Sequence, residues 1–98
     1  MIIKEIKDMI LDPRGRYYLP AKEIAKFNGE VILLRQGKKI LFLTKREWDE
    51  LEEKELKGLK GTAFRRKSRI LYSSAFSEEI RTGNRLHIPS CLFKGGQN

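Results

Sequence analysis

Cysteine and histidine are scarce in this 98-residue chain, which has one of each, Cys91 and His87. A single cysteine cannot form an internal disulfide, and the sequence has no Cys/His cluster of the kind that holds zinc. The histidine has no serine or cysteine partner at a recognisable spacing, so no nucleophile–base pair is evident. We therefore expect a protein that is not an enzyme and needs no cofactor or metal, compatible with a reducing cytosol.

The sequence also lacks long apolar runs. Its first residues are rich in isoleucine, but they are interrupted by Lys4, Glu5, Lys7 and Asp8. The segment is therefore too polar for a signal peptide or a membrane span. From this pattern we expect a cytoplasmic protein with no membrane partner.

Acidic residues are the minority among the charged ones, with 13 Asp and Glu against 21 Lys and Arg and a formal net charge of +8. A basic surplus this large in a short chain favours an anionic partner, such as nucleic acid, an anionic membrane or an acidic protein. Solubility alone is the simpler explanation. The length suggests one domain, or two very small halves that share a core.

Turn residues and apolar alternation predict a fold of mixed β with short helices, in the α+β class. Residues 2–11 and 16–19 are expected to form a β-hairpin, because Pro13 and Gly15 mark a turn between them. A second hairpin is expected from 31–35 and 40–43, and further strands at 76–80 and 85–88.

Three helical segments are expected between and after the two hairpins. A short one begins at Pro20 and ends near Phe27. The next begins at a capping box formed by Thr44 and Glu47, carries Trp48 on the side that packs against the sheet, and ends near Gly58. The third is basic and covers 63–73, and its candidate core residues are Phe64, Ile70 and Leu71.

A short internal repeat appears when residues 15–20 are placed over residues 84–89. The arginines Arg16 and Arg85 then coincide, as do the two prolines and the apolar residue before each. Gly15 and Asn84 also agree in chemistry, because both tolerate left-handed backbone angles at a turn. Such a repeat suggests pseudo-symmetry between two halves of the chain.

At these residues the chain resembles the MraZ family, within the AbrB-like group of swapped-hairpin transcription factors. The family's mark is an Asp-x-x-x-Arg turn followed by a strand and proline, present twice. The segment 12–22 resembles the first copy closely, and 41–51 and 63–66 resemble the strand, the tryptophan-bearing helix and the segment that follow. In the second copy, Arg81 stands where the family has aspartate, so 81–85 keeps only the arginine.

The resemblance implies a swapped-hairpin AbrB-like β-barrel with an internal pseudo-two-fold repeat. It implies a single MraZ-like domain over 1–98, with a first repeat at about 1–60 and a truncated second repeat at about 61–98. It also implies a ring-like homo-oligomer, associated with the nucleoid, that regulates transcription by binding double-stranded DNA at repeated promoter elements. No small-molecule substrate is expected.

The candidate DNA-binding residues lie on the two turns and just beyond the first. Arginine offers a planar fork of donors to phosphate or to a guanine edge, and glycine leaves room for close backbone approach. We expect Asp12 to hold the first turn by accepting hydrogen bonds from its N–H groups or from Arg16. The candidates are Asp12, Arg14, Gly15 and Arg16 of the first turn, then Lys22, and Arg81 and Arg85 of the second turn.

Simpler roles remain open for each of these residues. Asp12 and Arg16 could form an internal salt bridge that only shapes the hairpin, and Lys22 could be a solvated lysine. The second turn is expected to be mainly structural or an auxiliary phosphate contact. The basic run 65–69 could line a phosphate path or be a solvated helix face.

Two other functions fit the same composition. An RNA-binding or ribosome-associated module would need the same positive charge. An antitoxin-like protein of the same broad fold would instead bind a toxin protein.

Overall fold

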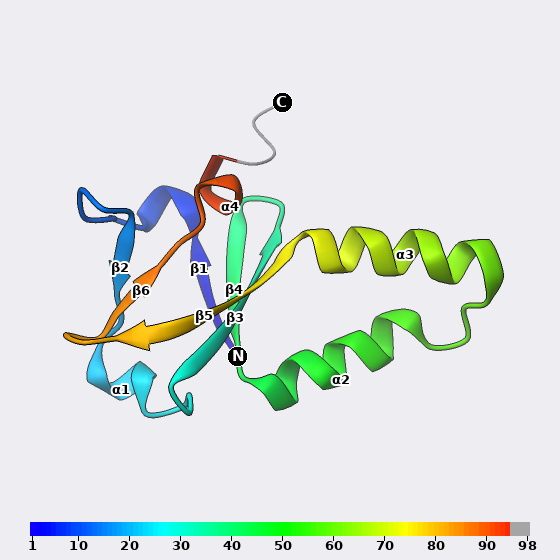
Figure 1. Cartoon of the computed structure of the whole chain (residues 1–98), viewed down its shortest axis with the longest axis horizontal. Helices are drawn as coiled ribbons and strands as arrows, with labels where there is room; N and C mark the ends of the chain where they lie inside the picture. Colours follow the sequence, from blue (N-terminus) through cyan, green and yellow to red (C-terminus); the bar gives the residue numbers. More distant parts are fainter. Residues whose placement is uncertain (95–98) are drawn as a thin grey trace.

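The computed structural model describes residues 1–94 and confirms the α+β class. Six antiparallel strands form one sheet in the order β1-β4-β3-β5-β6-β2, which curls into a half-barrel (Figure 1). The strands are β1 (Ile2–Glu5), β2 (Arg16–Tyr18), β3 (Glu30–Gln36), β4 (Lys39–Leu43), β5 (Ala75–Arg81) and β6 (Arg85–His87). The helices are η1 (Ile6–Asp8), α1 (Ala21–Ile24), α2 (Lys45–Leu56), α3 (Gly61–Ser73) and α4 (Ser90–Lys94).

The hairpin of β3 and β4 forms the middle of the fold, as its two apolar runs predicted. Both strands are buried on both faces, so alternate residues enter two different cores. Leu33 and Phe42 face the concave side, whereas Leu34 and Leu41 face the helices α2 and α3. The hairpin therefore joins the two packed layers of the protein.

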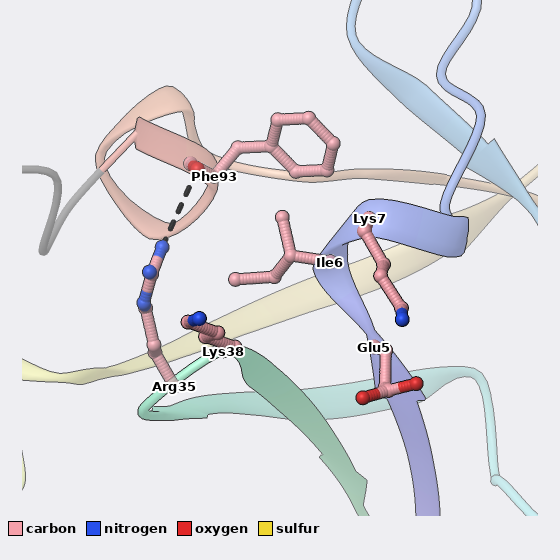
Figure 2. A pocket seen from close by; sticks show the side chains of 6 residues that line it. All are labelled: Glu5, Ile6, Lys7, Arg35, Lys38 and Phe93. Atoms are coloured by element: carbon pink, nitrogen blue, oxygen red, sulfur yellow. Dashed lines mark hydrogen bonds between the residues drawn. The ribbon is translucent and has the colours of Figure 1, made fainter.

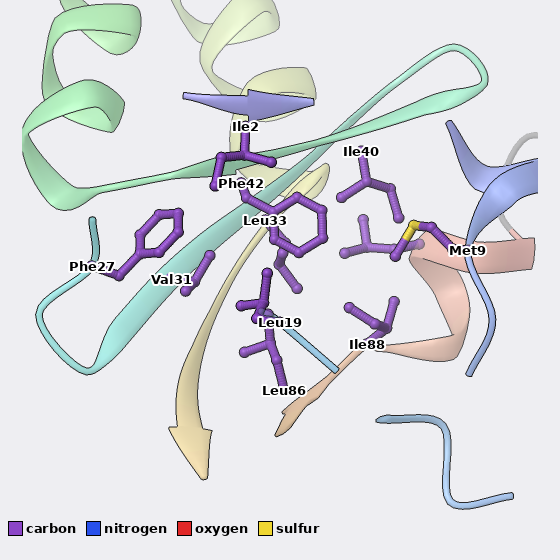
Figure 3. Packing of buried hydrophobic residues seen from close by; sticks show 11 residues of the cluster. Ile2, Met9, Leu19, Phe27, Val31, Leu33, Ile40, Phe42, Leu86 and Ile88 are labelled. Carbon is purple, nitrogen blue, oxygen red and sulfur yellow. The ribbon is translucent and has the colours of Figure 1, made fainter. Parts of the chain in front are cut away.

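The larger core fills the concave side of the half-barrel (Figure 3). It combines residues from both ends of the chain with the central hairpin. Its buried members are Ile2, Met9, Leu19, Phe27, Val31, Leu33, Ile40, Phe42, Leu86, Ile88 and Leu92. The curl of the sheet thus depends on apolar contacts between segments far apart in sequence.

The helices α2 and α3 form an antiparallel pair that extends away from the sheet (Figure 1). The predicted capping box is present: the Thr44 hydroxyl accepts the Glu47 N–H at 3.1 Å, and the Glu47 carboxylate accepts the Thr44 N–H at 2.9 Å. Trp48 packs onto the sheet as expected. None of the helices within residues 1–94 is both long and apolar enough to cross a membrane.

Two predictions about local packing were wrong. Residues 2–11 and 16–19 do not form a hairpin, because β1 pairs with β4 and β2 pairs with β6. With these pairings Tyr17 and Leu19 pack against the large core. Phe64 and Ile70 are not core residues either; they are 42% and 60% exposed, whereas Leu71 is the residue of α3 that is buried.

The short repeat occupies corresponding places on β2 and β6. Tyr17 lies opposite Leu86, its equivalent in the repeat. The Leu19 N–H donates to Asn84 at 2.9 Å, and the equivalent Ile88 N–H donates to Gly15 at 3.0 Å. Gly15 and Asn84 have φ of 77° and 60°, so the left-handed backbone expected at both is confirmed. The two strands are thus related locally by an approximate two-fold axis.

Replacing Leu33 by alanine is expected to lower the free energy of unfolding by about 2–5 kcal/mol, because it leaves a cavity in a fully buried site. Ile10→Ala is the control, since Ile10 is 86% exposed, and it should change stability by less than about 0.5 kcal/mol. Urea denaturation followed by circular dichroism measures both. Equal losses for the two variants would contradict the burial of Leu33 in the large core.

Candidate nucleic-acid interface

The turn from Asp12 to Arg16 is closed by the side chain of its first residue. The Asp12 Oδ1 atom accepts the backbone N–H groups of Arg14 and Arg16, each at 2.9 Å. The Gly15 N–H donates to the Asp12 carbonyl at 2.9 Å, and the positive φ of Gly15 completes the bend. These are hydrogen bonds of the kind predicted for Asp12 from the sequence, and they fix the backbone that carries both arginines.

The second oxygen of the same carboxylate binds two arginine side chains. Arg16 Nε donates to Asp12 Oδ2 at 2.9 Å, and Arg85 Nη1 donates to that atom at 3.0 Å. Asp12 therefore joins the arginines of both turns, although 73 residues separate it from Arg85. The second turn, in which Arg81 replaces the expected aspartate, uses the acid of the first.

The hydrogen bonds of the turn hold the Asp12 carboxylate in its charged form. They lower its pKa from 3.8 to about 2, through the backbone N–H of Arg16 first and then through the Arg16 side chain and the Arg14 N–H. The side chain is 17% exposed, so the charge lies at the edge of the surface rather than in the core. At neutral pH this residue is a fixed anion between two cations.

Both arginines lie on the outer face of the sheet. Tyr17 and Leu86 point inward to the large core, so their neighbours along each strand point outward. The register pairs Arg16 with His87 and Tyr18 with Arg85, and it pairs Arg81 of β5 with Arg85. We call this surface the arginine face; its residues are Arg16, Tyr18, Arg81, Arg85 and His87.

Tyr18 and His87 were not among the predicted site residues. His87 is exposed, and Tyr18 is 55% exposed. The spacing in the sequence could have identified both residues, because alternate residues of a β-strand point to the same side of the sheet. Tyr18 is two residues from Arg16, and His87 is two residues from Arg85.

The remaining predicted cations lie around the arginine face. Arg14 is exposed at the tip of the first turn, and Lys22 is exposed on α1, at the other end of β2 (Figure 1). Within residues 1–94, the side chains of Arg14, Lys22 and Arg81 make no hydrogen bond or ion pair. They are therefore available to an anionic ligand.

The basic run 65–69 is not brought to this face. It lies on α3, which extends away from the sheet on the side opposite β2 and β6 (Figure 1). Lys67 pairs with Glu55 of α2 at 3.5 Å, so one of its charges is used within the helical pair. The structure thus separates this run from the two turns.

A pocket of about 450 Å³ lies where α4 meets the central hairpin (Figure 2). Arg35 Nη1 donates to the Phe93 carbonyl at 3.3 Å and also to the Leu92 carbonyl, so it anchors α4 to β3. The pocket is lined by Glu5, Ile6, Lys7, Arg35, Lys38 and Phe93. With one carboxylate and no histidine, serine or cysteine, this lining does not provide an acid–base pair or a nucleophile.

No family model matches the chain, and no curated protein matches it either. The resemblance of the turns to the MraZ pattern therefore stays a prediction.

Acid should weaken the fold through Asp12. Its pKa is lower in the folded state, so its ionised form stabilises the fold fully above about pH 4, and this contribution disappears as pH falls toward its folded pKa of about 2. Asp12→Asn should therefore show a shallower loss of unfolding free energy between these pH values. Urea denaturation at a series of pH values measures this slope.

Asp8→Asn is the control, because Asp8 is exposed and has no ion pair within residues 1–94 while the change of net charge is the same. An acid-induced loss in Asp12→Asn as steep as in the unsubstituted protein would show that the carboxylate is not held as described.

Proposed function

We propose that this protein is a sequence-specific DNA-binding regulator of transcription, acting as a homo-oligomer on repeated promoter elements. The observation that carries the proposal is the Asp12 carboxylate shared by Arg16 and Arg85. It supports the proposal because it holds two partly exposed guanidinium groups in fixed positions on one surface. In this proposal the fold is of the swapped-hairpin AbrB-like kind, with MraZ-like repeats, and the protein is associated with the nucleoid.

A shared anion of this kind suits arginines that contact DNA. Arg16 uses Nε and Arg85 uses Nη1 for Asp12, so each keeps further N–H donors for phosphate or base edges. A guanidinium group already fixed in orientation loses less conformational freedom when it binds. Arg14 and Arg81 flank this pair and carry the contacts to phosphate.

The homo-oligomer follows from the weakness of one such surface. Non-specific contacts to DNA give a dissociation constant of roughly 10⁻⁴ to 10⁻⁶ M at physiological salt. Linking several copies whose spacing matches the DNA raises the overall affinity by about 10² to 10⁴. A regulator built on this small domain therefore gains from repeated DNA elements read by repeated subunits.

Arg14→Ala is expected to abolish the gel shift of a duplex that the unsubstituted protein selects from a randomised library. The reason is the loss of an exposed cation at the turn, whose side chain makes no ion pair within residues 1–94. The gel shift should be lost at physiological salt; at low salt, where residual binding can be measured, the slope of log affinity against log salt should fall by about 1 for each copy of the turn that contacts the duplex. Light scattering should give an unchanged oligomer mass.

Lys39→Ala removes the same charge from the central hairpin and should leave the gel shift intact. Intact binding by Arg14→Ala would remove this turn from the DNA contact. Preferential competition by structured RNA over duplex DNA would favour the RNA-binding alternative, and a stable monomer without DNA affinity would refute the proposal.

A further inference from the structure

Two exposed side chains of the arginine face, Tyr18 and His87, belong to neither of the two apolar cores. The residues on either side of Tyr18 provide the packing of this strand: the Tyr17 ring lies 5.9 Å from that of Phe42, and Leu19 is fully buried. Tyr18 itself is 55% exposed. Neither the Tyr18 hydroxyl nor the His87 imidazole has a hydrogen-bond partner within residues 1–94.

Each of these side chains lies directly across the strand pair from an arginine. Tyr18 lies opposite Arg85, and His87 lies opposite Arg16, and directly opposed residues have Cβ atoms about 4.5–5.5 Å apart. The local two-fold axis exchanges the two pairs. The outer face of β2 and β6 therefore presents two ring-and-arginine pairs in opposite orientations.

We infer that Tyr18 and His87 are the specificity-determining residues of this face, reading base edges while the arginines bind the phosphate backbone. The inference rests on the proposed function. Phosphate contacts position a protein on a duplex, and sequence is read by hydrogen bonds and apolar contacts to base edges. Tyr18 and His87 each combine an apolar ring with an unused polar atom, so each can make both kinds of base contact.

The strand geometry fits this division of labour. The major groove is about 12 Å wide and admits a two-stranded β-ribbon, with outward side chains reaching the bases. Arg16 and Arg85 are tied to Asp12, whose position at the turn draws both guanidinium groups to one end of the ribbon. Tyr18 and His87 carry no such tie and remain free to meet different bases.

The inference also explains why the two halves of the repeat differ at this position. The arginines are the same in both halves, and Asp12 holds both of them, so the arginines do not distinguish the two halves. The rings are different, tyrosine in one half and histidine in the other. We therefore expect the base contacted by Tyr18 to differ from the base contacted by His87.

The test is selection of duplexes from a randomised library by the unsubstituted protein and by Tyr18→Ala and His87→Ala. Each variant should lose a preference of roughly 5- to 150-fold at one base position, the usual discrimination at a single base pair. The dependence of affinity on salt should not change, because the phosphate contacts remain. Tyr72→Ala is the matched control, since Tyr72 is 50% exposed on α3.

Thermal unfolding checks that each variant is folded. If Tyr18→Ala does not fold, Tyr18→Thr replaces it, because threonine favours β-strands. Unchanged base preferences in the Tyr18 and His87 variants would overturn the inference while leaving the proposed function in place. A lower salt slope with intact preferences would also overturn it, since these residues would then contact phosphate. No base preference in the unsubstituted protein would overturn both.

Discussion

The structure of the exposed face depends on one carboxylate, Asp12, which accepts four hydrogen bonds. Two come from backbone N–H groups of its own turn, and two come from the side chains of Arg16 and Arg85. Without this anion, two guanidinium groups would lie close together on the surface and repel each other. Asp12 thus determines both the bend of the first turn and the spacing of the arginines, and the second turn needs no acid of its own.

The strands β2 and β6 separate core residues from surface residues by the simple alternation of a β-strand. Tyr17, Leu19, Leu86 and Ile88 point inward and close the concave core. The residues between them point outward, where polar and aromatic groups cost nothing in packing. The two-fold relation of these strands means that core contacts and surface contacts are repeated together. A face of this kind can change its outward residues, as at Tyr18 and His87, while the inward ones keep the pairing.

Much of the local structure could be predicted from the sequence. The central hairpin, the capping box of α2 and the left-handed residues at Gly15 and Asn84 each depend on a few neighbouring residues. The partners of β1 and β2 could not be predicted. The turn between these strands is present, but β1 pairs with β4 and β2 pairs with β6. The sequence also predicts Ile70 as a core residue, but this side chain is 60% exposed, because α3 extends away from the sheet that could cover it (Figure 1).

For the candidate site, the sequence by itself determined the first turn. Asp12, Gly15 and Arg16 lie within five residues, so their hydrogen bonds depend on local backbone geometry and need no distant partner. Only the tertiary structure decided that Arg85 completes the same ion cluster and that Tyr18 and His87 share its face. These relations depend on the pairing of β2 with β6, which is set by burial of their inward side chains in a core built from the whole chain.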